Sequence, residues 1–313
     1  MAENILILSM TRMGDMIQTT PLISGLKEKY PTAKITLLVT SDFASAVPLI
    51  PDVDESIILN LRQFDKQENW EDLSWVKIYR YLEKSVEDIK SRNFDLLVNL
   101  SHSKFSALMV RYLGIKNIVG FYCNDFGNRM TGHPWMQYFS VEVFNRKYNE
   151  FNLVEIFSRS GGVDVRGRAI EVVRSQNQLS VDTLMSFDEE DIVIGFQAGS
   201  SLEGRRWPAR SFADLADMLI ENLNARIIIF GVQSENKVAE EIKSLAKNKD
   251  RILNLAGKTS LSELSQLLEK CKYLVTNDTG TMHLAAALGT KIVGLFFAHA
   301  HPYETAPFSP GHL

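Results

Sequence analysis

The sequence predicts an α/β protein with two domains, each a parallel sheet wrapped by helices. Short, continuously apolar runs alternate with segments whose apolar residues repeat at helical spacing, which is the pattern of β-α-β units. The same pattern restarts near residue 190, after a polar and weakly periodic stretch. A chain of 313 residues is long enough for two domains of ordinary size.

The first half opens with two apolar runs that flank one amphipathic segment. We expect a strand over 4–8, a loop over 9–15, a helix over about 16–29 and a strand over 35–39. Pro31 ends this helix because its ring cannot continue the hydrogen-bonding pattern. This order is the first β-α-β unit of the predicted fold.

A long helix should precede the apolar run FDLLVNLS, which is the next expected strand, and another strand should cover 117–121. Five apolar residues of the helix repeat every three or four positions: Trp75, Tyr79, Leu82, Val86 and Ile89. We interpret them as one buried helix face rather than as a cofactor-binding stripe.

The second half alternates strands and helices more regularly. Strands are expected in DIVIGFQ, ARIIIFG, RILNLAG, KYLVTND and KIVGLFF, and helices in SFADLADMLIENLN, SENKVAEEIKSLAK, SLSELSQLLEKC and GTMHLAAALG. Ser211 is the expected cap of the first helix, and Gly289 ends the last one as its C′ residue. We therefore predict domains over residues 1–175 and 185–313, with a ligand cleft lined by the carboxyl ends of the strands.

Composition and charge exclude several classes of function. A net charge of −4 and a pI near 5.9 give no long-range field to gather DNA or RNA, so we expect no nucleic-acid partner. No run of about 18 apolar residues is present, so membrane contact should be at most peripheral. We expect no signal peptide, and the two cysteines fit a reducing, cytoplasmic location, with Cys271 as a core residue.

The stretch MTRMGDMIQTTPL places an acid where the first strand ends. Gly14 permits a tight turn, and Asp15 stands just before the expected helix. Asp15 is either the cap of this helix, because its carboxylate suits the positive helix end, or a general base at the floor of the cleft. The local sequence leaves both interpretations open.

Two further loops after strands carry polar side chains. The loop QAGSSLEGRRWP could form an anion site from Ser200, Ser201 and the guanidinium of Arg205. Alternatively, it could be a flexible surface segment with a solvated arginine pair. In GVQSENKVAEE, Glu235 could accept hydrogen bonds from ribose hydroxyls or be an ordinary first-turn acid. Neither GxGxxG nor a Walker motif occurs.

The last polar loop lies in VTNDTGTMHLAAALG. Asp278 and Thr279 follow a strand, Gly280 turns the chain, and His283 falls in the first turn of the next helix. Asp278 and Thr279 could simply be caps. Alternatively, these residues and the free N–H groups of the helix start form part of a binding site.

Three blocks of the sequence resemble the signature blocks of glycosyltransferase family 9, the heptosyltransferases. They are ILSMTRMGDMIQTTPLISGLKEKYP, GSSLEGRRWPARSFADLADML and NDTGTMHLAAALGTKIVGLFF, in the family's order and spread over nearly the whole chain. The resemblance implies the GT-B fold, in which two Rossmann-like domains face each other across a cleft. It also implies an inverting enzyme that moves a heptose or related sugar from an ADP-sugar to a lipopolysaccharide-core-like glycan. The donor of the best-known members is ADP-heptose. The reaction is expected to need no metal or other cofactor.

The resemblance also assigns roles to individual residues. Asp15 matches the family's proposed catalytic base. The donor is expected to contact Ser200, Ser201, Arg205, Glu235, Asp278, Thr279, Gly280 and His283. Arg205 stands where most members have a lysine, which keeps the charge and changes its geometry. The loop FAHAHP around His301 also departs from the family pattern.

The acceptor is expected to meet the N-terminal domain. His102, Lys104 and Arg129, in SHSKFS and FYCNDFGNRM, are expected on loops after strands, where they could bind an anionic acceptor or simply be solvated. A lipid-anchored acceptor would bring the enzyme to the inner face of the cytoplasmic membrane.

Other functions remain compatible with the same pattern of elements. A nucleotide-sugar epimerase of GT-B architecture would need no acceptor, and a non-catalytic module would bind a nucleotide-sugar without turnover. An NAD-dependent dehydrogenase is disfavoured by the missing GxGxxG motif.

Overall fold

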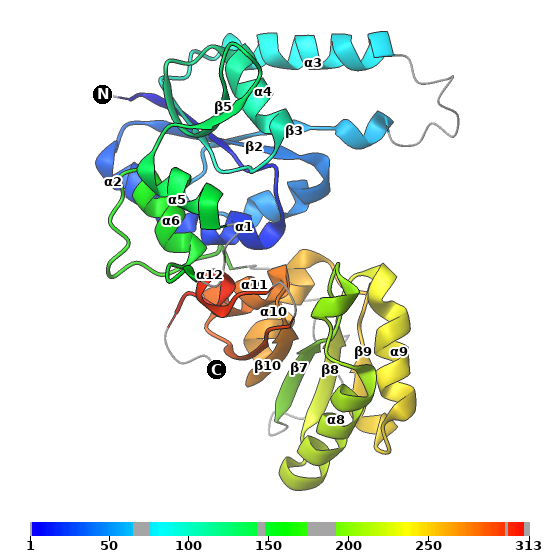
Figure 1. The fold of residues 1–313 in the computed structure, drawn as a ribbon. Helices are drawn as coiled ribbons and strands as arrows, with labels where there is room; N and C mark the ends of the chain where they lie inside the picture. Colours follow the sequence, from blue (N-terminus) through cyan, green and yellow to red (C-terminus); the bar gives the residue numbers. More distant parts are fainter. Residues whose placement is uncertain (1, 65–74, 143–147, 175–191, 298–299, 310–313) are drawn as a thin grey trace. The chain divides into compact units, whose positions relative to one another are not determined.

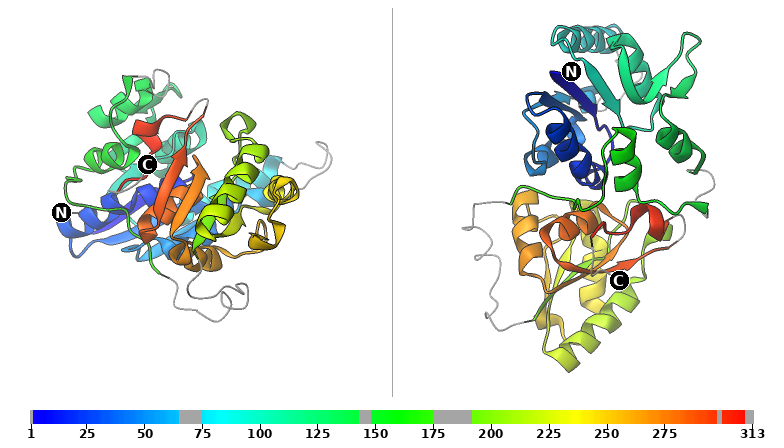
Figure 2. Two further views of the ribbon diagram at one scale, coloured as in Figure 1. Left: turned by 90° about the horizontal axis from the view of Figure 1, so that it is seen from below. Right: turned by 90° about the vertical axis from the view of Figure 1, so that its left-hand side faces the viewer.

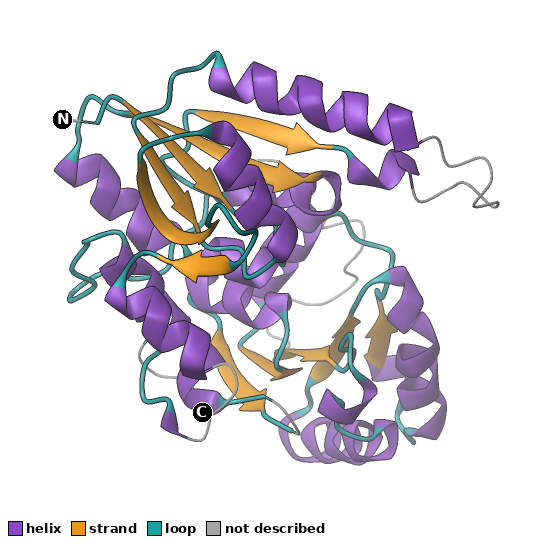
Figure 3. Ribbon diagram, turned by 45° about the horizontal axis from the view of Figure 1, so that its top comes forward, coloured by secondary structure: helices purple, strands orange, loops and turns teal. Residues whose placement is uncertain are grey.

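The computed structural model describes residues 2–64, 75–142, 148–174, 192–297 and 300–309 (Figure 1). Its contacts divide the chain into two compact units, unit 1 over 1–168 and unit 2 over 169–313. The junction predicted near 170–190 falls mostly in 175–191, outside the described residues. Both units contain a parallel sheet with helices, which confirms the predicted α/β class (Figure 3).

The sheet of unit 1 has the strand order β3-β2-β1-β4-β5-β6, and only the last pair is antiparallel. Its strands are β1 (Asn4–Leu8), β2 (Lys34–Thr40), β3 (Glu55–Leu59), β4 (Leu96–Asn99), β5 (Asn117–Cys123) and β6 (Arg129–Thr131). Central strand β1 places Ile5 opposite both Ile35 and Leu96. The strands predicted around 4–8, 35–39, 94–101 and 117–121 are therefore confirmed.

Helices and short 3₁₀ segments surround this sheet. The helices are α1 (Met13–Gln18), α2 (Thr20–Lys29), α3 (Trp75–Lys90), α4 (Lys104–Leu113), α5 (Pro134–Glu142) and α6 (Leu153–Ser160), and the 3₁₀ segments are η1 (Ser41–Leu49) and η2 (Leu61–Phe64). Ile89 of α3 and Val110 of α4 join Leu6, Leu8 and Leu97 of the sheet in one buried cluster. Figure 1 shows α3 and α4 on one side of the sheet and α1, α2 and α6 on the other.

The expected single helix over about 16–29 is wrong, because the structure has two helices that divide at Thr19. Helix α1 already begins at Met13, so Asp15 lies inside it and not in a preceding loop. The break precedes Pro21, which has no N–H to donate to the carbonyl of Ile17. The hydroxyl of Thr20 donates to that carbonyl instead, at 2.9 Å.

The buried face predicted for α3 is wrong at its N-terminal end. Trp75 and Tyr79 are exposed, whereas Leu82 and Val86 are half-buried and Ile89 is buried. The first half of α3 contacts η2 through the face that carries Tyr81. The Tyr81 hydroxyl accepts a hydrogen bond from the Asn60 N–H at 2.8 Å, and the Tyr81 ring packs on Phe64.

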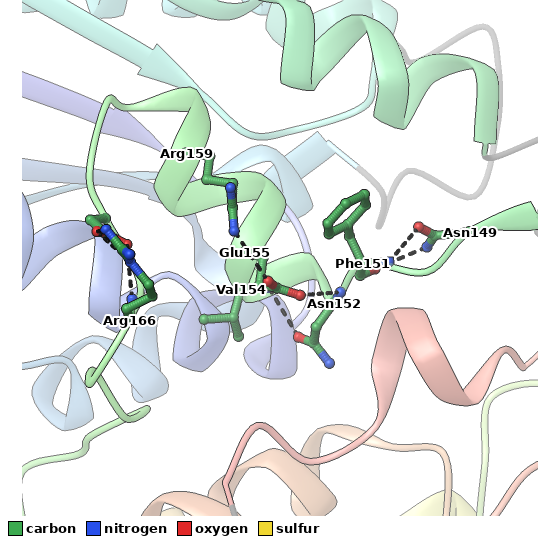
Figure 4. A network of polar contacts seen from close by, with 8 residues as sticks. Asn149, Phe151, Asn152, Val154, Glu155, Arg159 and Arg166 are labelled. Atoms are coloured by element: carbon green, nitrogen blue, oxygen red, sulfur yellow. Dashed lines mark hydrogen bonds and ion pairs between the residues drawn. The ribbon is translucent and has the colours of Figure 1, made fainter.

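Helix α6 is fixed at its start by a reciprocal cap (Figure 4). Asn152 Oδ1 accepts from the Val154 N–H at 3.1 Å, and the Glu155 carboxylate accepts from the Asn152 N–H at 3.2 Å. Arg159 adds an ion pair to Glu155 at 3.6 Å. These contacts satisfy backbone groups that a helix start leaves free, and α6 then packs on α2.

The sheet of unit 2 is wholly parallel, in the order β11-β10-β7-β8-β9. Its strands are β7 (Val193–Gln197), β8 (Arg226–Phe230), β9 (Ile252–Asn254), β10 (Tyr273–Asn277) and β11 (Lys291–Leu295). Its helices are α8 (Ala209–Leu223), α9 (Asn236–Leu245), α10 (Leu261–Lys270), α11 (Gly280–Leu288) and α12 (Pro302–Thr305), with 3₁₀ segments η5 (Glu203–Arg205), η6 (Gln233–Glu235) and η7 (Lys249–Arg251). Figure 2 shows these helices around the sheet from two further directions.

The strands and helices predicted for the second half are confirmed, but one cap is not. Helix α8 begins at Ala209 with Pro208 before it, so Ser211 lies inside the helix and is not its cap. Gly289 ends α11 with a φ of +85°, as predicted. Burial raises the pKa of Cys271 to about 12, as expected for a core thiol. No helix among the described residues is long and apolar enough to cross a membrane.

Candidate active site

The polar loops of unit 2 meet where its strand order reverses. Strands β7 and β10 are neighbours in the sheet, but the chain leaves them in opposite directions, through α8 toward β8 and through α11 toward β11. Right-handed connections place such helices on opposite faces and leave a crevice at the carboxyl ends of the two strands. The segments 198–207 and 278–283 both start at this point.

Asn277 joins these two segments, although the sequence analysis did not identify it as a site residue. Its side chain is fully buried at the end of β10. Nδ2 donates to the carbonyl of Ala198 at 2.7 Å, and Oδ1 accepts from the Trp207 N–H at 3.1 Å. One amide therefore holds both ends of the loop that carries the serines and arginines.

Arg205 and Asp278 form an ion pair beside this amide. Arg205 Nη1 lies 3.3 Å from Asp278 Oδ2, and the two side chains are only 13% and 8% exposed. Arg205 Nε is buried and has no hydrogen-bond partner among the described residues. The structure thus brings together two predicted donor contacts, and a buried guanidinium N–H of Arg205 remains without a hydrogen-bond partner among the described residues.

The neighbouring arginine stabilises the loop itself. Arg206 donates to the carbonyl of Ser200 from Nε at 2.9 Å and from Nη2 at 2.6 Å. Ser200 is buried, whereas Ser201 is exposed. The alternative of a solvated arginine pair is therefore wrong, because Arg205 and Arg206 are both half-buried and partnered.

Glu235 lies across the end of β7. Its Oε2 accepts from Gln197 Nε2 at 3.1 Å and from the Val232 N–H at 3.0 Å. Gln197 in turn accepts from the Thr281 hydroxyl at 3.2 Å. A Cβ on Gly199 would lie 2.0 Å from the Glu235 carboxyl carbon, so a larger residue there would have to displace this carboxylate. These contacts connect the ends of β7 and β8 to the first turn of α11.

The first turn of α11 has no side-chain cap. Thr279 occupies the N-cap position, as the cap interpretation predicted, but its side chain makes no capping hydrogen bond. Its hydroxyl lies 3.4 Å from that of Thr276. Helix α11 starts at Gly280, where its first N–H groups can bind an anion. Burial lowers the pKa of His283 to about 4, so this imidazole is neutral at pH 7.

In unit 1, Asp15 follows β1, which with its neighbour β4 forms the strand reversal of the other sheet. The cap position belongs to Arg12, and Asp15 is the third residue of α1. The Arg12 N–H donates to Asp15 Oδ2 at 3.4 Å. The carboxylate thus supports the helix start without being its N-cap residue, and it is only half-buried.

Two of the three predicted acceptor residues meet in unit 1. Arg129 Nη1 lies 3.1 Å from His102 Nδ1 and donates to the His102 carbonyl at 3.2 Å. Burial and the nearby guanidinium lower the pKa of His102. Lys104 is exposed as the first residue of α4, and Arg129 begins β6, so the prediction that both lie on loops is wrong.

A comparison of the chain with protein-family models matches residues 83–312 to glycosyltransferase family 9 (heptosyltransferase). The chain belongs to this family. It is 27% identical to lipooligosaccharide heptosyltransferase 2 of Haemophilus influenzae, over 98% of this chain and 86% of that protein.

Solved structures of other family members share the fold of this glycosyltransferase. One is the E. coli ADP-heptose LPS heptosyltransferase II, with a TM-score of 0.75 and 23% identity over 99% of this chain and 89% of that one. Another is the E. coli heptosyltransferase WaaC with ADP, with a TM-score of 0.69 and 20% identity over 99% and 92% of the two chains.

Three residues that support the candidate site of this glycosyltransferase were not predicted from its sequence. Asn277, Gln197 and Arg206 act on the backbone or on other side chains of the site. A polar residue at the end of an otherwise apolar strand is the available signal for Gln197 and Asn277. Among the described residues, no three His, Cys, Asp or Glu side chains are grouped to hold a metal ion.

Proposed function

We propose that this glycosyltransferase moves a heptose, or a closely related sugar, from an ADP-sugar to a hydroxyl of a lipopolysaccharide-core glycan. The observation that carries the proposal is the polar cluster at the strand reversal of unit 2, where the buried pair of Arg205 and Asp278 lies next to Thr279 and the start of α11. The names of the similar heptosyltransferases suggest the sugar and the acceptor class. The reaction we propose inverts the anomeric centre and requires no metal or other cofactor.

The proposed donor contacts follow from the chemistry of a nucleoside diphosphate. The guanidinium of Arg205 and the first N–H groups of α11 would stabilise the negative charge that develops on the leaving diphosphate. Ser200 and Ser201 would donate to phosphate oxygens. Glu235, whose carboxylate is already oriented by Gln197, would accept from ribose hydroxyls.

Asp278 and His283 would complete the donor site. Asp278 orients Arg205, and its carboxylate could also accept from a hydroxyl of the sugar. His283 is neutral at pH 7, so it would contribute a hydrogen bond rather than a charge. Gly280 provides a backbone that a phosphate can approach closely.

Asp15 is the proposed general base. Its carboxylate would remove the proton of the acceptor hydroxyl as that oxygen attacks the anomeric carbon opposite the departing diphosphate. The C–O bond to the acceptor forms as the bond to the diphosphate breaks, which gives inversion in one displacement. Proton transfer of this kind typically contributes about 10²- to 10⁴-fold in rate.

His102, Lys104 and Arg129 are the proposed acceptor contacts in unit 1. Arg129 is a half-buried cation that contacts His102 and the Phe121 ring among the described residues, and an anionic acceptor would supply it with a carboxylate or phosphate. We further propose that the enzyme acts at the cytoplasmic face of the membrane, with peripheral contact and no nucleic-acid partner.

The decisive experiment combines nucleotide binding with turnover. Thermal unfolding is followed with ADP, UDP, GDP, CDP, NAD or ADP-heptose, with and without EDTA. A ligand present at a hundredfold excess over Kd stabilises the folded state by about 2.7 kcal/mol. We expect selective stabilisation by ADP and ADP-heptose that EDTA does not change, together with ADP release only when acceptor is added.

Each other outcome contradicts a defined part of the proposal. Preference for another nucleoside diphosphate would remove ADP-heptose as the donor. Donor isomerisation or nucleotide release without acceptor would favour an epimerase. Binding without any turnover would favour a nucleotide-sugar-binding protein, and stabilisation lost with EDTA would overturn metal independence.

A further inference from the structure

Unit 1 exposes several large aromatic side chains. Trp75 and Tyr79 of α3 are 68% and 64% exposed, Tyr112 of α4 is 63% exposed, and Phe126 in the turn between β5 and β6 is 89% exposed. Single exposed apolar residues are ordinary, but neighbouring aromatic residues on the surface mark an interaction site. We call these four residues the aromatic surface.

Packing and polar contacts bring the three contributing elements together. Helices α3 and α4 share one buried cluster, through Ile89 and Val110 among others. The hydrogen bond to Glu83 raises the pKa of Tyr79, and the nearby hydroxyl of Tyr112 adds a smaller effect of the same sign. The two tyrosines therefore lie on the same side of this helix pair, which Figure 1 shows above the sheet.

The turn with Phe126 is tied to the same helix. Arg111 of α4 forms an ion pair with Asp125 of the turn at 2.9 Å. Tyr112 follows Arg111 in the chain, and Phe126 follows Asp125, so the ion pair holds the turn that carries Phe126 against the helix that carries Tyr112. The aromatic surface therefore extends from the start of α3 over α4 to the β5–β6 turn.

Basic side chains accompany the aromatic ones. The first half of α3, residues 75–82, contains Lys77 and Arg80 and no acid, and α4 contains Lys104 and Arg111 and no acid. The nearby acids are Glu83, which is hydrogen-bonded to Tyr79, Asp125, which is paired with Arg111, and Glu87 and Asp88 in the second half of α3. Helices α3 and α4 together carry six basic and three acidic residues. The chain as a whole carries a net charge of −4, so this face departs from the average in the basic direction.

We propose that the aromatic surface docks the enzyme on an anionic lipid bilayer. Tryptophan and tyrosine prefer the headgroup level of a membrane, because one end of each ring system is apolar and the other polar. Lysine and arginine near an anionic surface each contribute about 1 kcal/mol, or roughly fivefold, to binding. The membrane role rests on the proposed function, since a lipid-linked acceptor has to be reached at the bilayer.

Vesicle sedimentation tests the proposal with the full chain and no nucleotide. The vesicles consist of phosphatidylcholine alone or of phosphatidylcholine mixed with phosphatidylglycerol. We expect binding to the mixed vesicles that weakens as salt is added, and little binding to the neutral ones. The double variant Tyr79→Ser/Phe126→Ser should bind at least about tenfold more weakly, because it removes apolar contact with the interface. Arg80→Glu should lower binding about fivefold or more.

A matched control uses exposed apolar residues of unit 2. Met218 and Leu223 of α8 are 60% and 48% exposed, so Met218→Ser/Leu223→Ser should bind vesicles like the unmodified protein. Equal binding by the aromatic variant and the control would overturn the proposal, as would binding that does not depend on phosphatidylglycerol or no vesicle binding at all.

Failure of this proposal can be distinguished from failure of the proposed function. Stabilisation by ADP reports on unit 2 and should be the same in the aromatic variant as in the unmodified chain. Vesicle binding without nucleotide reports only on the aromatic surface. If ADP fails to stabilise the chain but anionic vesicles still bind, the donor assignment is wrong and the docking surface stands.

Discussion

Arg205 donates to Asp278 within a largely buried pair, so its replacement has two separable effects. Arg205→Ala should weaken ADP binding by about 10- to 100-fold, because a charge-assisted hydrogen bond to phosphate is lost. It should also lower the free energy of unfolding by about 3 kcal/mol, because the largely buried ion pair between Arg205 and Asp278 is broken. Titration calorimetry and urea denaturation measure the two effects.

Arg210→Ala is the matched control for this prediction. Arg210 lies on the surface of α8 in an exposed ion pair with Asp214, and such pairs contribute little. An Arg205→Ala protein with unchanged ADP affinity would remove this residue from the phosphate site. Arg205→Lys, which restores the residue expected at this position in the family, should recover most of the affinity.

Asp15→Asn tests the proposed base. Turnover should fall by about 10²- to 10⁴-fold, whereas donor affinity should remain nearly unchanged. The amide oxygen can still accept the Arg12 N–H, so α1 should keep its start and the fold its stability. Steady-state kinetics with calorimetric ADP binding measures both, with Asp214→Asn as the control. Turnover near that of the unmodified enzyme would contradict the base assignment.

Protonation of His283 should make the free energy of unfolding depend on pH. Its pKa is lowered from 6.5 to about 4 by burial, so the unfolded chain binds a proton in the range where the folded chain does not. The free energy of unfolding should therefore decrease as the pH falls from about 6.5 toward 4, by about 2 kcal/mol from this group at pH 5.

Urea denaturation at pH 7 and pH 5 provides the measurement. His283→Asn should lose the part of the pH dependence that this group contributes, while other groups keep theirs. The same decrease in both proteins would show that His283 titrates normally in the folded state.

At the scale of elements, Asn277 connects β10 to both ends of the segment 198–207. Asn277→Leu would leave the Trp207 N–H and the Ala198 carbonyl without these partners, so we expect a loss of about 2–4 kcal/mol in the free energy of unfolding. ADP binding should weaken as well, because the loop that carries Arg205 loses its anchor. Calorimetry and denaturation report both losses.

The control for this variant is Asn222→Leu. Asn222 lies on the surface of α8, where its amide donates to the Met218 carbonyl, so the change should stay within about 0.5 kcal/mol. An Asn277→Leu protein that is as stable as this control would show that the amide does not anchor the loop.

The helices and strands also show which sequence patterns predict secondary structure and which fail to predict the buried face of a helix. Continuous apolar runs identified the parallel strands, since such strands are buried on both faces. Helical spacing identified α3 but misplaced its buried face at Trp75 and Tyr79, because several rotations of one helix satisfy the same period. The actual orientation depends on what packs beneath, here Phe64 under Tyr81.

At the scale of the whole molecule, the sequence predicts the fold class and the loops that form the site, but not their mutual contacts. The pairing of Arg205 with Asp278 joins residues 73 positions apart, and that of His102 with Arg129 joins residues 27 apart. Local patterns contain no information about such partners. The family motifs pointed to two loops that the structure connects at the ends of β7 and β10, whereas the anchoring by Asn277 became visible only in three dimensions.

Each sheet is assembled from one continuous stretch of the chain, and this has a consequence for biosynthesis. All described strands of the first sheet lie between Asn4 and Thr131, and those of the second begin at Val193. The first sheet therefore has every strand it needs while the second half is still being translated. Folding on the ribosome can then proceed one unit at a time, which shortens the period in which unpaired strand edges are available for aggregation.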